Sequence, residues 1–367
     1  MRYYIVAGEK SGDIYGGRLI QALKQEDPQA EFRCWGGACM QQAGGILVVH
    51  YHGLALMGLA FLCSLRKLFS YLRYCQKDLL NFQPDVVILI DYAGFNLRIA
   101  KFAKKHHVKT FYYVSPKVWA WNYRRVHKIK AYVDRMFSIF PFERDFYKKY
   151  DYAVDYVGNP LVEQVRFHRT HPNFLAACQL DSRPMIALLP GSRVQEVSSI
   201  LPIMLSVVPA LCTYQFVVAA IKDIPDELYE EASQAASVRL VYDQLYDVLA
   251  HAHAAVVTAG TATLETALFD VPQVVVYKTD ALTYRLAKWL IKLKYISLVN
   301  ILAGKEVVSE LVQHHCNTKT LLKSLRKIMG DTCYRQAQLA GYQSIKQALG
   351  ETQASKQAAQ LMVQYLH

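Results

Sequence analysis

The chain opens with a short apolar run that leads into a glycine-containing loop, Tyr3-Tyr4-Ile5-Val6-Ala7-Gly8-Glu9-Lys10-Ser11-Gly12-Asp13. Residues 14–25 follow with apolar side chains at three- and four-residue spacing, which predicts the order strand, loop, helix. The run is too short for a secretory signal, and we expect it to form the first strand of a sheet. A second unit of this kind, Ala187-Leu188-Leu189-Pro190-Gly191-Ser192-Arg193, begins near residue 184. Because the pattern starts twice, two α/β domains are predicted.

The rest of the chain continues the alternation of strand and helix. Short runs rich in Val, Ile and Tyr alternate with segments of helical spacing, such as residues 97–105 and 261–269. This alternation predicts parallel, doubly wound sheets covered by helices, with ligands bound at the carboxyl ends of the strands in a cleft between two halves. The predicted strands are residues 3–7, 31–35, 46–49, 85–91, 108–114, 135–139, 154–157, 184–189, 214–219, 239–242, 254–258 and 273–277.

A polar stretch separates the two halves. Residues from about 158 to 184 carry three prolines, which is typical of a domain junction. We therefore expect an N-terminal domain over residues 1–165 and a second domain over residues 166–350. Residues 351–367 are expected to form a further amphipathic helix, which either packs within its own chain, crossing back, or is exchanged between two subunits.

The composition excludes several classes of protein. Of the 367 residues, 53% are hydrophobic and 20% are charged, so the chain is not intrinsically disordered. No run reaches the roughly 18 apolar residues that span a bilayer. The eight cysteines form no CxxC pair, which excludes a zinc ribbon and a thioredoxin-type site and favours a reducing compartment. The 12 histidines include close pairs but no ligand cluster, so we predict no metal.

Three loops between a strand and a helix carry residues suited to a phosphorylated ligand. Glycine lets the backbone approach the ligand, and a helix start presents unpaired N–H groups to an anion. Arginine offers a diphosphate a bidentate fork, and a carboxylate can accept from both hydroxyls of a ribose. The candidates are Gly8, Ser11, Gly12, Asp13, Gly191, Ser192, Arg193, Gly260, Thr261, Ala262 and Glu265. Structural roles stay open, with Asp13 and Glu265 as capping residues and Arg193 as a surface cation.

Asp91 ends the most hydrophobic strand, Val86-Val87-Ile88-Leu89-Ile90. A carboxylate at the end of a buried strand is partly desolvated, which favours a general base with a raised pKa. The alternative is a cap for the next helix. Two tryptophans, Trp119 and Trp121, follow the next strand, and they either line an acceptor site or fill the core.

Basic residues gather on the segment from residue 57 to residue 82. An apolar stripe at helical spacing accompanies them, and Leu62 and Phe69 widen it on one side. The stripe consists of Phe61, Leu65, Leu68, Leu72 and Leu79. We predict an interfacial helix on anionic lipid, with core packing as the alternative. The predicted membrane-facing residues are Phe61, Leu65, Arg66, Phe69 and Arg73. The net charge of +12 would also suit nucleic acid, but no nucleic-acid-binding motif accompanies it, and no nucleic-acid partner is predicted.

Taken together, these motifs resemble those of the lipid-A-disaccharide synthase family, glycosyltransferases of the GT-B fold. The matching stretches are collinear from residue 7 to about residue 312. They are Ala7-Gly8-Glu9-Lys10-Ser11-Gly12-Asp13, Met57-Gly58, Pro84-Asp85, Ile90-Asp91, Phe95-Asn96, Tyr113-Val114-Ser115-Pro116, Val118-Trp119-Ala120-Trp121, Phe140-Pro141-Phe142-Glu143, Leu188-Leu189-Pro190-Gly191-Ser192-Arg193, Gly260-Thr261-Ala262, Leu264-Glu265, Ser297-Leu298, Asn300 and Leu302-Ala303-Gly304.

The resemblance implies a fold and a reaction. The fold is two Rossmann-like, doubly wound parallel-sheet domains facing a cleft. The enzyme would transfer 2,3-diacylglucosamine from UDP to the 6-hydroxyl of 2,3-diacylglucosamine 1-phosphate, giving a β-1,6-linked disaccharide. Asp91 matches the family's essential aspartate and Arg193 its essential arginine, while Glu265 and Asn300 match nucleotide-side positions.

The resemblance also implies a setting. The family uses no metal and no cofactor, and it works at the anionic inner face of the cytoplasmic membrane, in the pathway that builds the Gram-negative outer membrane. We therefore expect a cytoplasmic, peripheral membrane enzyme whose partners are UDP-diacylglucosamine, diacylglucosamine 1-phosphate and the lipid surface. A homodimer stays open.

Three positions depart from the family pattern. Leu59-Ala60 stands where a Glu-Val pair is usual, which puts acceptor contacts there in doubt. Gly94 stands where many members have a second aspartate, which leaves Asp91 more isolated as the base. Val299 replaces a proline that often precedes the asparagine, which can alter the backbone beside Asn300.

Three other functions compete with this prediction. The nearest is another UDP-sugar transferase of the same fold, acting on a soluble or polyprenyl-linked acceptor. A non-catalytic lipid-binding module is the second. A nicotinamide-dependent oxidoreductase is the third, and it is disfavoured because the first loop is not GxGxxG.

Overall fold

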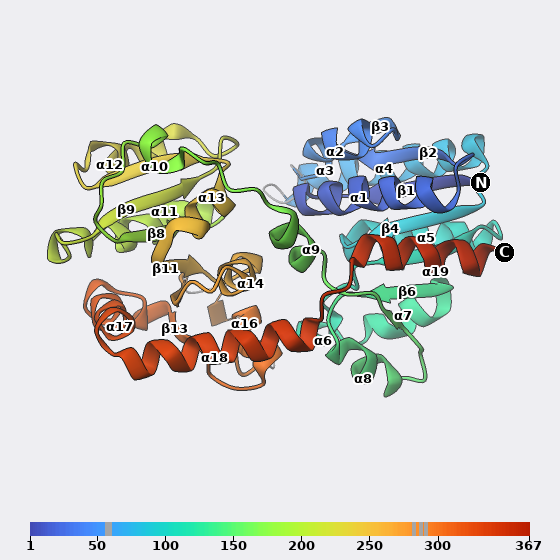
Figure 1. Ribbon diagram of the computed structural model, residues 1–367. Helices are drawn as coiled ribbons and strands as arrows, with labels where there is room; N and C mark the ends of the chain where they lie inside the picture. Colours follow the sequence, from blue (N-terminus) through green and yellow to red (C-terminus); the bar gives the residue numbers. More distant parts are fainter. Residues whose placement is uncertain (56–60, 281–283, 286–288, 290–292) are drawn as a thin grey trace. The chain divides into compact units, whose positions relative to one another are not determined.

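The computed structural model describes residues 1–55, 61–280, 284–285, 289 and 293–367. It divides into two compact units. Unit 1 comprises Met1–Pro160 together with Glu351–His367, and unit 2 comprises Leu161–Gly350 (Figure 1). Each unit is described by itself below.

Unit 1 is built on a seven-stranded sheet with the order β3-β2-β1-β4-β5-β6-β7. Neighbouring strands pair in parallel, and β1 lies between β2 and β4. The strands are β1 (Arg2–Ala7), β2 (Glu31–Gly36), β3 (Ile46–His50), β4 (Val86–Ile90), β5 (Lys109–Tyr113), β6 (Arg135–Ser138) and β7 (Asp155–Tyr156). All five residues of β4 are buried, as expected for a central strand with helices on both faces.

The helices of unit 1 cover both faces of this sheet. One core cluster packs α4, α5 and α7 against β1 and β4, and α1 packs against α2 and α19. The helices are α1 (Lys10–Glu26), α2 (Ala38–Gln42), α3 (Tyr51–Ala55), α4 (Phe61–Phe82), α5 (Ala93–Lys105), α6 (Val118–Trp121), α7 (Arg125–Tyr132), α8 (Phe142–Lys148) and α19 (Ala354–Leu366).

The last helix, α19, returns to unit 1 within the same chain (Figure 1). Tyr365 near its end donates to the two carboxylate oxygens of Asp155, at 3.3 and 3.2 Å. The guanidinium of Arg135 lies 4.0 Å from the centre of the Tyr365 ring. These contacts, together with the packing on α1, place the C-terminal helix on unit 1 of its own chain.

Unit 2 repeats the plan on a six-stranded sheet with the order β10-β9-β8-β11-β12-β13. Its strands are β8 (Met185–Leu189), β9 (Gln215–Ala220), β10 (Val238–Tyr242), β11 (Ala252–Thr258), β12 (Gln273–Tyr277) and β13 (Ser309–Val312). Alternate residues of β8 enter two different clusters, with Ile186 and Leu188 in one and Met185 and Ala187 in the other. The sheet is therefore covered on both faces, as predicted.

Helices α11 and α17 cover one face of this sheet, and α10 and α13 cover the other. The helices are α9 (Pro160–Phe167), α10 (Phe174–Ala177), α11 (Val194–Leu205), α12 (Glu230–Gln234), α13 (Leu245–His251), α14 (Thr261–Leu268), α16 (Leu298–Ala303), α17 (Thr318–Gly330) and α18 (Thr332–Leu349). Three 3₁₀ turns are Val208–Ala210, Asp226–Tyr229 and Gln313–His315.

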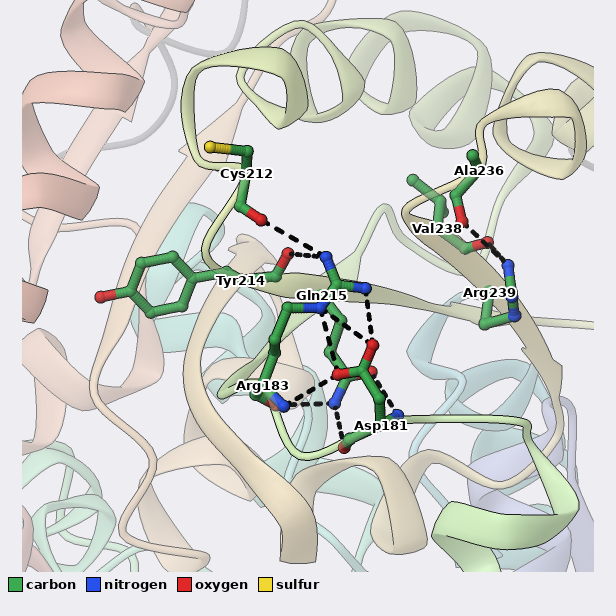
Figure 2. A network of polar contacts seen from close by, with 8 residues as sticks. All are labelled: Asp181, Arg183, Cys212, Tyr214, Gln215, Ala236, Val238 and Arg239. Carbon is green, nitrogen blue, oxygen red and sulfur yellow. Dashed lines mark hydrogen bonds and ion pairs between the residues drawn. The ribbon is translucent and has the colours of Figure 1, made fainter.

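A polar network fastens the segment that leads into β8. The side-chain oxygen of Gln215 accepts from the Asp181 backbone N–H at 3.0 Å, and its nitrogen donates to the carbonyls of Asp181 and Arg183 (Figure 2). Arg183 also pairs with Asp181 and donates to the carbonyl of Cys212 at 3.3 Å. This network holds the polar segment predicted as a junction against the amino ends of β8 and β9.

Each of the 12 predicted strands is present, with ends that differ by at most two residues. The structure adds β13, with the sequence Ser309-Glu310-Leu311-Val312, which the sequence analysis missed. A four-residue edge strand with two polar residues lacks both the length and the apolar character that predict a strand.

Candidate active site

Both sheets reverse their strand order at one point, and the loops that carry most of the predicted site residues follow the strands at this point. In unit 1 the reversal is between β1 and β4, where Gly8 and Asp91 follow the strand ends. In unit 2 it is between β8 and β11, which lead into Gly191 and Gly260. In doubly wound sheets this position leaves a crevice at the carboxyl ends of the strands, where ligands bind.

The backbone at Asp91 is held in an uncommon conformation. Asp91 and Tyr92 both have φ of 45°, in the left-handed region that non-glycine residues rarely adopt. The Asp91 carbonyl accepts from Asn96 Nδ2 at 2.9 Å and from the Tyr112 hydroxyl. Such backbone strain is typical of functional sites, where surrounding contacts maintain it. Helix α5 has Tyr92 as its N-cap, so Asp91 is not the cap of this helix.

Tyr92 is turned onto the first loop. A Cβ on Gly8 would lie 2.3 Å from the Tyr92 ring, so only glycine allows this close approach. The loop after β1 and the turn after β4 therefore pack directly on each other. The sequence predicted each loop, and the structure brings Gly8 and the Asp91 turn together.

The Asp91 carboxyl has an environment suited to a base. Its pKa is raised to about 6, mainly by burial, and this value includes the Lys117 ammonium, which lowers the pKa, and the neighbouring Glu9, which raises it. A pKa near 6 leaves the group ionised at neutral pH, yet basic enough to take a proton in a transition state. The prediction of a raised pKa at Asp91 is confirmed.

Asp13 has its carboxylate bound within unit 1. It accepts from the backbone N–H groups of Gly37 at 2.7 Å, Cys39 at 3.0 Å and Met40 at 3.0 Å, and its exposed fraction is 3%. The oxygens thus satisfy the N-terminus of α2 and the glycine turn before it. Gly12 is buried beside Asp13, whereas Ser11 is exposed at the start of α1.

A buried glutamate holds the loop that follows β5. Glu143 is fully buried and accepts from Trp119 Nε1 at 3.1 Å and from the backbone N–H of Ile139 and Phe140. Burial raises the pKa of Glu143 to about 7. The Trp119 ring packs edge-on against Phe142 at 4.9 Å, so the structure favours packing over an open acceptor surface for this tryptophan. The side chain of Trp121 lies outside the described residues.

In unit 2, the carboxylate of Glu196 binds the loop that follows β8. Arg193 is the N-cap of α11, and its side chain is 72% exposed. Its Nη1 lies 3.3 Å from Glu196 Oε1, while Glu196 Oε2 accepts from the Ser192 N–H at 3.0 Å. Gly191 has φ of 118°, and a Cβ there would meet Glu196 at 2.4 Å. Glu196 thus lies where the loop and helix start would receive a phosphate.

The loop after β11 positions Glu265. Gly260 is the N-cap of α14, Thr261 is exposed at its first position, and Ala262 follows half-buried. Glu265 is half-buried, and its Oε1 accepts from the Tyr246 hydroxyl at 2.8 Å. Burial raises the pKa of Glu265, and the Tyr246 hydrogen bond lowers it.

Asn300 is fully buried near the start of α16. Its Oδ1 accepts from the N–H groups of Val307 at 2.7 Å and Val308 at 3.0 Å. Its Nδ2 donates to the Val308 carbonyl and to Glu310 Oε1. A direct contact of Asn300 with a nucleotide would require these bonds to be exchanged.

The chain was compared with known proteins. A family model described as Lipid-A-disaccharide synthetase matches residues 3–364. The lipid-A-disaccharide synthase of Syntrophus aciditrophicus is 38% identical over 364 residues, covering 97% of this chain and 95% of that protein. That of Geobacter sulfurreducens is 35% identical over 376 residues, covering 100% and 97%. The chain belongs to the lipid-A-disaccharide synthase family.

Membership of the lipid-A-disaccharide synthase family makes the chain an enzyme, a glycosyltransferase of lipid A biosynthesis. The predicted resemblance is thereby confirmed, and the family is favoured over a non-catalytic lipid-binding module.

Solved structures confirm the fold. A UDP-GlcNAc 2-epimerase from Neisseria meningitidis bound to UDP-GlcNAc has a TM-score of 0.70 at 13% identity, covering 99% of this chain and 100% of that one. The glycotransferase of kitacinnamycin has a TM-score of 0.65 at 14% identity, covering 100% and 99%. At these identities the likeness shows the GT-B type of fold and nothing about substrate.

The positions that depart from the lipid-A-disaccharide synthase pattern lie in different structural environments. A Cβ on Gly94 would have no atom within 4 Å, so the structure leaves space for a side chain to begin at this position. Val299 is fully buried in α16. Leu59 and Ala60 lie outside the described residues.

Helix α4 divides its side chains between core and solvent. Leu72 and Leu79 of the predicted apolar stripe are buried, and Asp78 between them binds Arg33 Nη2 at 2.5 Å. Phe69 is 54% exposed on the outer side. The same helix carries the exposed cations Arg66, Lys67, Arg73 and Lys77. The side chains of Phe61 and Leu65 lie outside the described residues.

The described residues contain neither a membrane-spanning helix nor a cluster of metal ligands. No helix among them has the length and apolar character to cross a membrane. No group of three or more His, Cys, Asp or Glu side chains in that part of the chain could hold a metal ion.

Sequence reasoning missed several polar residues around the site. These are Asn96 and Tyr112 at Asp91, Glu143 at Trp119, Glu196 at Arg193 and Tyr246 at Glu265. The motifs Phe95-Asn96 and Phe140-Pro141-Phe142-Glu143 were signals for Asn96 and Glu143, but nothing local in the sequence shows the partners of these two residues. A cavity of about 430 Å³ beside β10, lined partly by Lys222 and Arg239, includes none of the predicted site residues.

Proposed function

We propose that this chain transfers 2,3-diacylglucosamine from its UDP donor to the 6-hydroxyl of 2,3-diacylglucosamine 1-phosphate. The products are the β-1,6-linked disaccharide 1-phosphate and UDP. Beyond membership of the family, the proposal rests mainly on the environment of Asp91. Asp91 has a carboxyl of raised pKa in a strained turn at the strand reversal of unit 1.

In this mechanism Asp91 takes the proton of the acceptor hydroxyl as that oxygen attacks the anomeric carbon. The oxygen attacks on the face opposite UDP, so the configuration inverts, and positive charge develops on the sugar ring. Lys117 helps to keep Asp91 ionised before the step. Asn96 and Tyr112 hold the backbone at Asp91, so the carboxylate does not have to reorganise.

The donor side uses the loops of unit 2. Arg193 and the N–H groups at the start of α11 neutralise the charge that grows on the departing diphosphate. Glu265 accepts from the ribose hydroxyls, and Gly260, Thr261 and Ala262 form the helix start beside it. Asn300 and Asp13 support the loops around them through the hydrogen bonds described above.

The first prediction is that UDP release requires both lipid substrates. We expect acylated UDP-glucosamine together with diacylglucosamine 1-phosphate to release UDP, at a rate on the order of 1–10³ per second. Release is measured by a coupled assay, and the product by mass spectrometry. Matched controls omit the acceptor or use a donor without acyl chains.

Two outcomes of this assay would contradict the proposal. Equal turnover of the donor without acyl chains would point to another UDP-sugar transferase, acting on a soluble or polyprenyl-linked acceptor. No UDP release with any pair of substrates would overturn the proposed reaction itself.

We also propose that α4 brings the enzyme to anionic lipid on the inner face of the cytoplasmic membrane. The exposed aromatic Phe69 shares this helix with the exposed cations Arg66, Lys67, Arg73 and Lys77, and both proposed substrates carry acyl chains. Each cation near an anionic surface contributes about 1 kcal/mol to binding. The apolar ring of Phe69 would strengthen binding further by inserting into the headgroup region of the bilayer.

The second prediction tests this surface by charge reversal. The double variant Arg66→Glu/Arg73→Glu should lower partition into anionic vesicles about 10- to 100-fold, measured by sedimentation at low salt. The matched control is Lys323→Glu/Arg326→Glu on α17, which changes the net charge equally at exposed positions of unit 2. If both pairs lower partition equally, net charge explains binding and the α4 surface does not.

A further inference from the structure

Tyr246 links Glu265, the carboxylate predicted on the nucleotide side, to Gln164 on another helix. Its hydroxyl lies 2.8 Å from Glu265 Oε1 and 3.0 Å from Gln164 Oε1. Glu265 belongs to α14, Tyr246 to α13 and Gln164 to α9, so one hydroxyl joins three helices. All three residues belong to unit 2.

The Tyr246 hydroxyl is close to two oxygen atoms, and its single proton can serve only one of them at a time. A tyrosine hydroxyl has one proton, so it donates to one acceptor at a time. The carboxylate is the stronger acceptor, because hydrogen bonds to charged groups are shorter and stronger. With the Gln164 amide turned so that its nitrogen faces Tyr246, the amide donates to the tyrosine oxygen and the tyrosine donates to Glu265. This order satisfies every group.

The ring of Tyr246 is held from the side as well. It packs edge-on against His168 at 5.4 Å and in a tilted arrangement against Phe269 at 5.2 Å. His168 Nε2 lies 3.2 Å from Asp247, and the same carboxylate accepts from the His171 N–H at 2.7 Å. Two segments that are distant in sequence thus fix the ring, so the hydroxyl reaches Glu265 in a defined position.

We propose that Tyr246 is a positioning residue for the nucleotide carboxylate, with Gln164 of α9 orienting the tyrosine hydroxyl. Tyr246 keeps Glu265 ionised and turned so that its second oxygen and remaining lone pairs are available to the two hydroxyls of a ribose. The inference rests on the proposed function, because it assumes that Glu265 receives the ribose of UDP. It extends the donor site to α9, the helix that begins at the boundary between the two units.

The experiment measures UDP binding to the full-length protein by calorimetry, from about pH 5 to about pH 8. Tyr246→Phe removes the hydroxyl and keeps the ring contacts. We expect its Kd for UDP to rise about 10-fold at neutral pH, and Gln164→Leu to raise it about threefold. The pKa of Glu265 should also rise without this hydrogen bond, so affinity should be lost on acidification at a higher pH than in the parent.

Two controls separate positioning from a structural effect. Tyr365→Phe removes a tyrosine–carboxylate bond of the same kind in unit 1, and it should leave UDP affinity unchanged. His168→Gln removes the imidazole beside the Tyr246 ring, and the acid limb should persist in it if Glu265 is the titrating group.

The outcomes are distinct. If the parent protein does not bind UDP, the proposed function fails. If the parent binds UDP and Tyr246→Phe binds it with the same Kd and the same acid limb, the positioning role is overturned. A fall in Tm of Tyr246→Phe with unchanged UDP binding would also overturn it, because that pattern is purely structural.

Discussion

Replacing Asp91 by Asn should lower kcat by about 10²–10⁴-fold and leave the Kd for the UDP donor within about twofold. The amide keeps the size and most of the polarity of the carboxylate, but it cannot accept the acceptor hydroxyl's proton at neutral pH. Donor binding is spared because the donor loops belong to unit 2. Steady-state UDP release and calorimetric donor titration measure the two quantities separately.

The pH profile gives an independent test of the same group. Burial sets the pKa of Asp91 to about 6 in the free enzyme. The base must be deprotonated to act, so kcat/KM should fall as the pH drops through about 6 and level off above it. Asp91→Asn should lack this limb in its residual activity.

Two charged neighbours of Asp91 shift its pKa in opposite directions, so substituting them provides two controls. Lys117→Met removes the cation that lowers the pKa of Asp91, so the acid limb should move to higher pH. Glu9→Gln removes a charge that raises this pKa, so the limb should move to lower pH. Near-normal turnover in Asp91→Asn would eliminate the base assignment, whatever the direction of these shifts.

The strands and their order of appearance could be predicted because their signal is local. The run Val86-Val87-Ile88-Leu89-Ile90 is apolar on both sides, and both sides are buried. The edge strand β13 has no such signal, since two of its four residues are polar. The sequence left open whether the stripe of α4 faces lipid or the core, and the structure buries two of its members, Leu72 and Leu79, in the core. A helix with apolar residues around more than one face does not show which of them the sheet will cover.

The candidate site could be predicted only in part, because the hydrogen-bond partners of its polar residues are distant in the sequence. A polar residue after a strand end can be located from the sequence, as at Asp91 and Asp13. Whether its oxygens are free depends on donors far along the chain. The Asp13 carboxylate is used by three N–H groups 24 to 27 residues away, and Trp119 is bound by Glu143 24 residues away. No local pattern records such pairings.

Arg193→Ala should lower kcat/KM by about 10²–10³-fold, the loss expected when a donor to a developing anion is removed. The leaving diphosphate gains charge as the bond to the sugar breaks, and the guanidinium can bind two of its oxygens at once. Arg193→Lys keeps the charge but not the fork, so it should recover only part of the loss. UDP-release kinetics at saturating acceptor measure both variants.

The Glu196 contact makes this prediction sharper. Without a ligand, Arg193 is 3.3 Å from Glu196 Oε1, and Glu196 also occupies the Ser192 N–H. A diphosphate must replace this carboxylate at both donors, so Glu196→Gln should lower the KM for the donor a few-fold while Arg193 is present. In the Arg193→Ala background the same substitution should have a smaller effect, because one of the two exchanged contacts is already gone. Equal effects in the two backgrounds would show that Arg193 and Glu196 act independently. A normal kcat/KM in Arg193→Ala would remove Arg193 from the reaction altogether.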